Sequence, residues 1–138
     1  MQKPSETTDD SWVYVTSTFR REERTERSGK WLVFSALEEQ DHAWEVISAS
    51  TESDELGFAS KAATFVDNPR QSNAKELPIC VYTYDSSDLI DVARVFDQLR
   101  QLGFTQRLFY KTDDDTRAGR YANGVSLYFS PPGSSTFR

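Results

Sequence analysis

The sequence has few of the residues that bind metal ions or cross-link a chain. Its 138 residues include one cysteine, Cys80, and one histidine, His42. A single cysteine excludes an internal disulfide framework and a cysteine-rich zinc site, and a single histidine excludes a multi-histidine metal site. We therefore expect neither a metal nor a cofactor, and the shortage of cysteine favours the reducing environment of the cytoplasm.

Long hydrophobic runs are also missing. No apolar stretch approaches the roughly 20 residues that a membrane-spanning helix requires. The first ten residues are polar and acidic, whereas a secretory signal combines a basic start with an apolar stretch. We therefore expect no membrane partner.

Basic residues are outnumbered by acidic ones. The chain has 16 Lys and Arg against 22 Asp and Glu, which gives a formal net charge of −6. This balance argues against a strongly basic nucleic-acid-binding protein but leaves room for a local basic groove. Aromatic residues are abundant, with 3 Trp, 6 Tyr and 9 Phe, and their rings supply enough area to fill one hydrophobic core.

The distribution of polar and apolar residues predicts one domain between two tails. Residues 1–9 and 131–138 offer little to bury, so we expect both segments to be disordered. Residues 10–130 then form a single α+β domain, which is an ordinary length for one domain.

Two long helices are predicted from apolar residues at helical spacing. The first lies near residues 36–51, where Ser35 and Glu38 match a capping box. The second lies near residues 86–102 and ends at Gly103. The residues expected to be buried on these helices are Trp44, Ile47, Val92, Phe96 and Leu99, packed against the strands that hold Leu32, Val81 and Leu108.

Segments rich in β-branched and aromatic residues predict the strands. They lie at residues 12–16, 30–34, 58–65, 78–84, 106–111 and 125–129. A strand-helix-strand order thus occurs twice. Both a split β-α-β arrangement and a curved, mostly antiparallel sheet with the helices on one face fit this order. No glycine-rich phosphate loop follows any strand, so a doubly wound nucleotide-binding fold does not fit.

A series of motifs occurs in order over most of the chain. They are Gly29–Phe34, Trp44, Leu56-Gly57, Ser60-Lys61, Ile79–Tyr84, Asp91-Val92, Leu99–Gly103, Tyr110–Asp113, Thr116, Gly119 and Tyr121. Together they resemble the family typified by the basophilic leukaemia expressed protein, Bles. The resemblance implies a fold similar to that of translation initiation factor 4E, which binds the messenger-RNA cap. Some relatives carry the name phosphothreonine lyase domain, so the resemblance also raises a lyase activity.

The three tryptophans offer an aromatic cage as one interpretation. A cationic base can stack between two indoles while a carboxylate such as Glu45 neutralises its edge. Core packing is the alternative for Trp12, Trp31 and Trp44, and it is the usual fate of a ring within a strand or on an apolar helix stripe. We favour core packing.

Basic residues near two strands form the candidate ligand site. The predicted ligand-binding residues are Lys61, Lys111, Arg117, Arg120, Tyr110 and Tyr121. Arginine and lysine bind phosphate well, and tyrosines can stack or hydrogen-bond. We predict that the turn from Tyr110 to Tyr121 rims a groove, with Lys61 approaching from a neighbouring strand. The expected partner is a phosphorylated small molecule such as a nucleotide, an RNA end or a phosphopeptide. Surface pairing with Asp113, Asp114 and Asp115 is the structural alternative.

Two other functions stay open at this point. A phosphothreonine lyase needs a base such as Lys61 or Lys111, an acid such as His42, and arginines for the phosphate. His42 lies beside the apolar stripe of its predicted helix, which favours a solvated side chain. Cys80 lies in an apolar strand and is expected to be an inert core thiol. The third possibility is a protein-interaction domain that uses a helix face.

Overall fold

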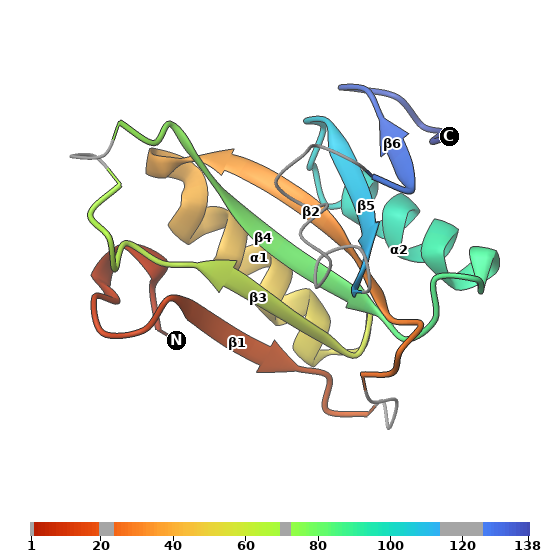
Figure 1. Ribbon diagram of the computed structural model, residues 1–138, viewed down its shortest axis with the longest axis horizontal. Coiled ribbons are helices and arrows are strands. Elements are labelled where there is room, and N and C mark those ends of the chain that lie inside the picture. The colour runs from red at the N-terminus through yellow and green to blue at the C-terminus, as the bar shows by residue number, and fades with distance from the viewer. Residues whose placement is uncertain (1, 20–23, 70–72, 114–125) are drawn as a thin grey trace.

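The computed structural model describes residues 2–19, 24–69, 73–113 and 126–138 (Figure 1). Its strands are β1 (Trp12–Thr16), β2 (Gly29–Ala36), β3 (Ala59–Ala63), β4 (Glu76–Thr83), β5 (Leu108–Thr112) and β6 (Tyr128–Ser130). Its helices are α1 (Gln40–Glu52) and α2 (Leu89–Gln101), with two short 3-10 helices, η1 (Pro4–Glu6) and η2 (Leu37–Glu39). None of the helices in these ranges has both the length and the apolar character needed to span a bilayer.

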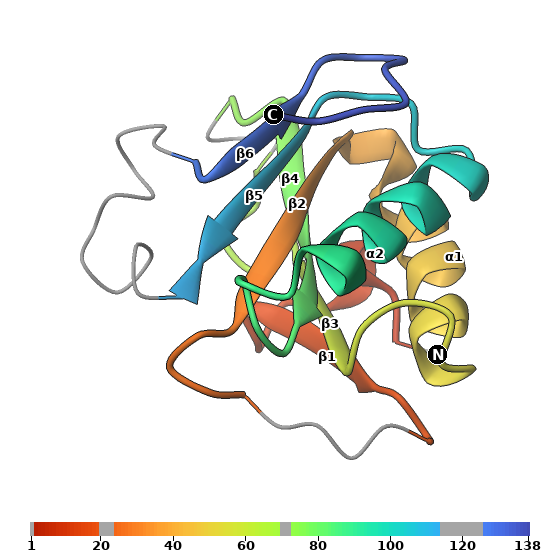
Figure 2. The same ribbon diagram turned by 90° about the vertical axis from the view of Figure 1, so that its right-hand side faces the viewer.

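The strands form one six-stranded sheet in the order β1-β3-β4-β2-β5-β6. Every neighbouring pair is antiparallel. Both α-helices lie against the same face of this twisted sheet (Figures 1 and 2). Neither α1 nor α2 lies on the opposite face, which we call the helix-free face. The predicted α+β fold, with a mostly antiparallel sheet and two helices on one face, is confirmed.

The two strand-helix-strand units interlock. β2 and β3 run parallel on either side of β4, so β2, α1 and β3 form a split β-α-β unit. β4 and β5 run parallel on either side of β2, so β4, α2 and β5 form a second one. The structure therefore combines the two arrangements that the sequence left open, because each split unit inserts a strand between the two strands of the other.

The helices begin later than their sequence signals indicate. Ser35 is a buried residue of β2, and α1 starts at Gln40 after η2, with no side-chain cap on either helix start. The predicted capping box is therefore wrong, since the strand continues through its first residue. The cap of α2 is Asp88, whose carboxylate accepts a hydrogen bond of 3.2 Å from the backbone N–H of Asp91.

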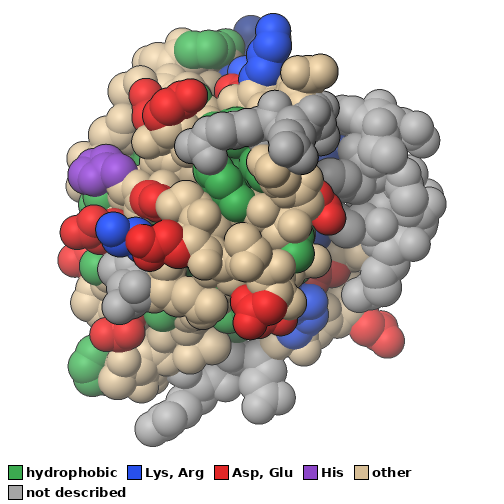
Figure 3. Space-filling model, turned by 90° about the vertical axis from the view of Figure 1, so that its left-hand side faces the viewer, with side chains coloured by type: hydrophobic (Ala, Val, Ile, Leu, Met, Phe, Trp, Pro, Cys, Tyr) green, Lys and Arg blue, Asp and Glu red, His purple; other side chains and the backbone are tan. Residues whose placement is uncertain are grey.

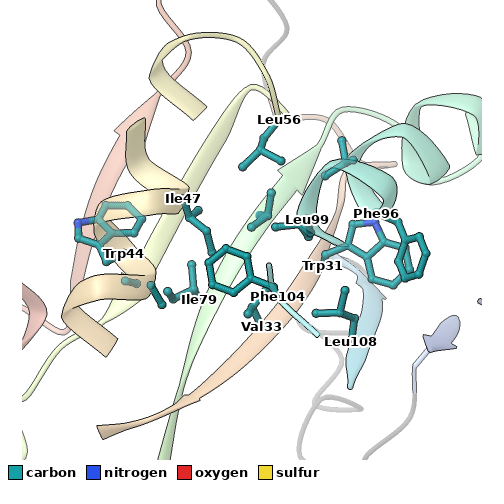
Figure 4. Packing of buried hydrophobic residues seen from close by; sticks show 14 of the residues in the cluster. Trp31, Val33, Trp44, Ile47, Leu56, Ile79, Phe96, Leu99, Phe104 and Leu108 are labelled. Atoms are coloured by element: carbon teal, nitrogen blue, oxygen red, sulfur yellow. The ribbon is translucent and has the colours of Figure 1, made fainter. Parts of the chain in front are cut away.

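The main hydrophobic core lies between the sheet and the helices (Figure 4). Trp31 of β2 lies against Phe96 of α2, with ring centroids 5.2 Å apart. The Trp31 indole N–H donates a hydrogen bond of 3.1 Å to the carbonyl oxygen of Val92. Trp44 and Ile47 project from α1 toward the sheet. Core packing is confirmed for Trp31 and Trp44, and the predicted buried faces of both helices are confirmed with them.

Two apolar residues of these elements lie outside the main core. Leu32 is buried, but it belongs to a second cluster with Cys80 and Tyr82 on the helix-free face. It follows Trp31 directly in β2, and successive strand residues point to opposite faces. Leu89, the first residue of α2, is 52% exposed.

The segment predicted as an N-terminal tail contacts the domain in this structure. The backbone N–H of Ser5 donates to a carboxylate oxygen of Asp41 at 2.9 Å. The backbone N–H of Phe65 donates to the carbonyl oxygen of Pro4 at 3.1 Å. Pro4 is buried in η1, so this segment packs beside α1 and the end of β3.

The segment predicted as a C-terminal tail packs against the core as well. The ring of Phe137 lies 5.2 Å from the ring of Trp31. Arg100 of α2 donates hydrogen bonds to the carbonyl oxygen of Ser134 at 2.8 Å and to the hydroxyl of Ser130 at 2.9 Å. One guanidinium thus attaches the last residues to α2.

Candidate functional site on the helix-free face

The strand register brings the predicted lysines to one face of the sheet. Lys111, Lys30 and Tyr82 stand in one row across β5, β2 and β4. Lys61 of β3 stands in the next row on that face, opposite Cys80 of β4. Paired residues on adjacent strands point to the same side, so all of these side chains leave the sheet on the helix-free face. Lys61 does not approach Lys111 from a neighbouring strand, however, because β4 and β2 lie between them.

The space between the two lysines is occupied by residues that the sequence analysis missed. The Lys30 ammonium forms an ion pair of 3.1 Å with Asp113, and both side chains are buried. Arg24 lies 3.6 Å from the other carboxylate oxygen of Asp113. We call Arg24, Lys30, Lys61, Lys111 and Asp113 the charged cluster. Sequence alone did not indicate Lys30 or Arg24, because their neighbours Asp113 and Tyr82 are distant along the chain.

Lys61 differs from the other cations in what surrounds it. Its ammonium lies 4.0 Å from the centroid of the Trp12 ring and 5.9 Å from that of Tyr82. No carboxylate in the described parts of the chain lies within ion-pair distance of it. Burial is the main cause that lowers the pKa of Lys61, and the nearby charges of Arg24 and Lys30 lower it further. Lys61 is thus a half-buried cation whose charged form is disfavoured by its surroundings.

Two aromatic rings on this face already have cations against them. Lys61 covers the ring of Trp12, and the Arg24 guanidinium lies 4.4 Å from the ring centroid of Tyr82. Both contacts have cation–π geometry, in which the positive group is attracted to the face of the ring. Trp12 has no second tryptophan beside it to complete an aromatic cage, because Trp31 and Trp44 are buried on the helix side of the sheet.

Tyr110 was predicted to bind ligand, but it points away from the charged cluster. Its ring is fully buried on the helix side, against Trp31 at 5.2 Å. Its hydroxyl shares a hydrogen bond of 2.6 Å with Thr83. Tyr110 and Lys111 are consecutive in β5, so only one of them can face the ligand. Strand alternation was the signal that could have separated the two residues.

The rest of the predicted site lies outside the described residues. Arg117, Arg120 and Tyr121 belong to this group, as do Asp114 and Asp115 of the acidic turn. Of that turn, Asp113 is described, and it pairs with Lys30 and Arg24 as a buried carboxylate.

The residues considered for lyase chemistry do not converge. His42 is exposed on α1, on the opposite side of the sheet from Lys61 and Lys111. A base and an acid that act on one substrate must both reach it, so His42 cannot serve with these lysines in a single site. Burial raises the pKa of the Cys80 thiol to about 11, which keeps this thiol protonated and poorly nucleophilic at neutral pH.

The fold as a whole is similar to that of a translation factor. A crystal structure of schistosome eIF4E complexed with m7GpppA and 4E-BP matches it with a TM-score of 0.69 and 12% sequence identity. The match covers 94% of this chain and 75% of the eIF4E chain. The likeness confirms the fold that the sequence motifs implied.

The sequence itself matches a family model over most of its length. The model describes the basophilic leukemia-expressed protein Bles03, and it matches residues 6–117. This range contains β1 to β5, both α-helices and every member of the charged cluster. The chain therefore belongs to the Bles03 family.

Proposed function

We propose that the protein is a binding module that holds the phosphate groups of a nucleotide or an RNA end on the helix-free face of its sheet. The observation that carries this proposal is the state of Lys61. Its ammonium is half-buried, close to Arg24 and Lys30, and lacks a carboxylate within ion-pair distance among the described residues. Removing a charge from water is costly unless a counter-charge compensates, and a phosphate oxygen would supply that counter-charge.

The arrangement of the charged cluster suits a phosphate chain better than an isolated cation or a neutral ligand. Ammonium and guanidinium groups form strong charge-assisted hydrogen bonds with phosphate. Asp113 binds Lys30 at 3.1 Å and thereby fixes its position, while Arg24 and Lys61 lie on the same face and are more exposed. The cluster therefore offers a fixed inner pair and two outer cations for an incoming anion.

The ring contacts further indicate which part of the ligand is recognised. Lys61 and Arg24 occupy the faces of Trp12 and Tyr82, so a base must displace a cation before it can stack there. The similar eIF4E structure contains m7GpppA, a nucleotide with both a base and a phosphate chain. In the present chain we assign the main contacts to the phosphates.

Calorimetric titration at low salt tests the proposal. The probes are tripolyphosphate, GTP, m7GTP and a phosphothreonine peptide, each added to the full chain. Tripolyphosphate and both nucleotides should bind with similar affinity, and binding should weaken steeply as salt increases. Lys61→Ala should weaken binding by about tenfold, as expected for one lost charge-assisted contact. Lys75→Ala is the matched control, because Lys75 is exposed and lies directly before β4.

Three results would contradict the proposal. The first is a lack of affinity for every phosphorylated probe at low salt. The second is an equal effect of Lys61→Ala and Lys75→Ala. The third is selective binding of the phosphothreonine peptide, which would assign the face to phosphoproteins.

A further inference from the structure

β1 forms one edge of the sheet, and no backbone group of the described residues pairs with its outer side. The N–H of Ser17 donates to the carbonyl of Phe58 at 2.9 Å, and the N–H of Thr64 donates to the carbonyl of Ser11 at 3.1 Å. These bonds fix which residues of β1 bond to β3, because bonded and non-bonded positions alternate along an antiparallel pair.

The same alternation identifies the residues that face outward. Trp12, Tyr14 and Thr16 direct their backbone N–H and C=O groups away from β3. No backbone group in the described parts of the chain bonds to them there. Tyr14 is also 67% exposed, so the middle of this edge is open to solvent.

The two edges of the sheet differ in whether a neighbouring segment bonds to the edge strand. At the other edge, Phe129 of β6 exchanges a pair of backbone hydrogen bonds with Arg138, at 2.8 and 3.0 Å. The sequence of β1 is Trp-Val-Tyr-Val-Thr, without a charge or a proline. Edge strands of monomers usually carry such residues, or a covering segment, to prevent pairing with another strand. β1 thus lacks the residues that normally prevent an edge strand from pairing with another strand.

A groove runs beside this edge on the helix side. It has a volume of about 430 Å³ and is lined by Val13 and Val15 of β1 and by Trp44, Ala49 and Glu52 of α1, among others. A strand added next to β1 would direct every second side chain toward this groove. Apolar side chains of moderate size would fit there, against the valines and the edge of the indole.

Acidic side chains lie at both ends of this edge. Asp9 and Asp10 precede β1, and Glu52 lies at its far end, where the carbonyl of Glu52 accepts a bond from the N–H of Thr18. All three side chains are exposed, and none has an ion-pair partner in the described residues. Figure 3, which faces the end where β1 begins, shows Asp and Glu side chains in several patches with fewer Lys and Arg between them.

We propose that β1 is a docking site for an extended segment of a partner protein, which adds to the sheet as a further strand. The segment carries apolar side chains at alternate positions and a lysine or arginine near each end. Backbone pairing supplies its affinity and the groove supplies its specificity, as in other cases of strand addition. This site uses the outer backbone of β1 and the groove on the helix side, whereas the charged cluster lies on the helix-free face, so the proposal does not depend on phosphate binding.

The acidic ends of the edge distinguish a basic segment from a second copy of the chain. Two copies paired antiparallel about Tyr14 would bring Asp10 of one copy toward Glu52 of the other. Each chain also carries a formal net charge of −6, so like charges would oppose this dimer. A segment with basic ends meets both acidic ends favourably.

Amide hydrogen exchange measured by NMR tests the proposal with a defined probe. The probe is an acetylated and amidated peptide of alternating valine and threonine with one lysine at each end. It should slow exchange of the Trp12, Tyr14 and Thr16 amides at least tenfold, while the amides of Val13 and Val15 change little. The matched control peptide carries N-methyl groups on alternate residues, so that it cannot donate to β1, and it should give no protection.

Two variants of the protein test the same contact by changing β1 instead of the peptide. Tyr14→Pro removes the outward donor at the centre of the edge and leaves the bonds to β3 intact, which is where an edge strand tolerates proline. Tyr14→Ala removes the ring and keeps the donor. Protection by the lysine-ended peptide should be lost with Tyr14→Pro and retained with Tyr14→Ala. If the proline variant does not fold, the N-methylated peptide still gives the comparison.

Several outcomes would overturn the proposal. One is unchanged exchange of all three amides with the lysine-ended peptide at millimolar concentration. Another is equal protection by the same peptide with glutamate ends, which would remove the argument from charge. Protection that grows with protein concentration in the absence of peptide would assign the edge to a second copy of this chain.

Discussion

The two faces of the sheet use the same strands for different purposes. On the helix side, Trp31 is enclosed by Phe96, Tyr110 and Phe137. On the helix-free face, the small cluster of Leu32, Cys80 and Tyr82 lies beside the charged cluster. Because side chains alternate along a strand, one residue step in β2 separates the Trp31 ring of the main core from the Lys30 ammonium of the charged cluster.

The faces also differ in the kind of contact that some of their polar groups make. On the helix side, Thr51 and Ser60 share a buried hydrogen bond of 2.7 Å, and the Trp31 indole is bonded to Val92. On the helix-free face, the Lys61 ammonium has ring contacts in place of a carboxylate. We therefore expect the helix side to contribute most of the stability, and the predictions below test this expectation.

The largest effect is expected from the helix side. Phe96→Ala should lower the free energy of unfolding by about 3–5 kcal/mol, since it leaves a cavity beside Trp31 and Phe137. Urea unfolding measures the change, with Leu89→Ala as the control on the same helix, because Leu89 is half-exposed. A Phe96→Ala protein as stable as the parent would refute the description of this core.

The buried ion pair is expected to stabilise the helix-free face and to limit its binding. Asp113→Asn leaves the Lys30 ammonium buried without its carboxylate, and such a change costs about 3 kcal/mol. The same substitution removes a negative charge from the charged cluster, so tripolyphosphate should bind more tightly while the protein unfolds more easily. Urea unfolding and calorimetry on one preparation give both values. A parallel loss of stability and affinity would contradict this prediction, and would show that holding Lys30 in place matters more for binding than removing the negative charge of Asp113.

The pH dependence of stability should carry a signature of Cys80. Its pKa is raised from 9.0 to about 11 by burial, so the folded state holds the thiol proton more strongly than the unfolded state. The resulting stability is present below pH 9 and is lost as pH rises from 9 to 11. The loss amounts to about 2–3 kcal/mol. Unfolding of the parent and of Cys80→Ala across this range isolates the effect, since the variant should lose less stability; identical curves would contradict it.

The smallest effect on stability is expected at Lys61. Lys61→Met removes a half-buried charge whose pKa is lowered chiefly by burial and retains an unbranched side chain against Trp12. We expect the free energy of unfolding to change by less than about 1 kcal/mol, while phosphate binding falls as it does in Lys61→Ala. A large destabilisation would move Lys61 from the ligand site to the structural part of the molecule.

Much of the fold could be predicted from the sequence, because it depends on local periodicity. Trp44 and Phe96 lie on the faces that helical spacing indicates. The sequence did not indicate which face a single strand residue points to, as at Leu32 on the helix-free face and Tyr110 on the helix side. Long-range contacts could not be predicted either. Phe137 is a single aromatic residue in a polar segment after two prolines, and nothing near it in the sequence indicates that it packs on the core.

The candidate site could be predicted only in part. Lys61 and Lys111 were found as basic residues of strands, and the structure places them on one face. Lys30 and Arg24 gave no signal, because their neighbours in space are distant along the chain.

Two glycines show how one sequence pattern can have two physical causes. Leu56-Gly57 and Leu102-Gly103 occupy equivalent places in the two split units. A Cβ at position 57 would lie 1.6 Å from the carbonyl oxygen of Tyr82, so the requirement there is close backbone approach. Gly103 has open space around it but a φ of +100°, so its requirement is conformational. The repeated motif was visible in the sequence, whereas the difference in cause needed coordinates.

The interlocked sheet has a consequence for how the chain folds during its synthesis. β1 and β2 emerge first, but β1 pairs with β3, and β2 pairs with β4 and β5. Trp31 is enclosed only when α2, β5 and finally Phe137 have been made. Folding dominated by such distant contacts is slow, and unfinished chains expose apolar strands to aggregation. The Trp31 ring therefore stays in contact with solvent, or with a chaperone, until Phe137 has been made.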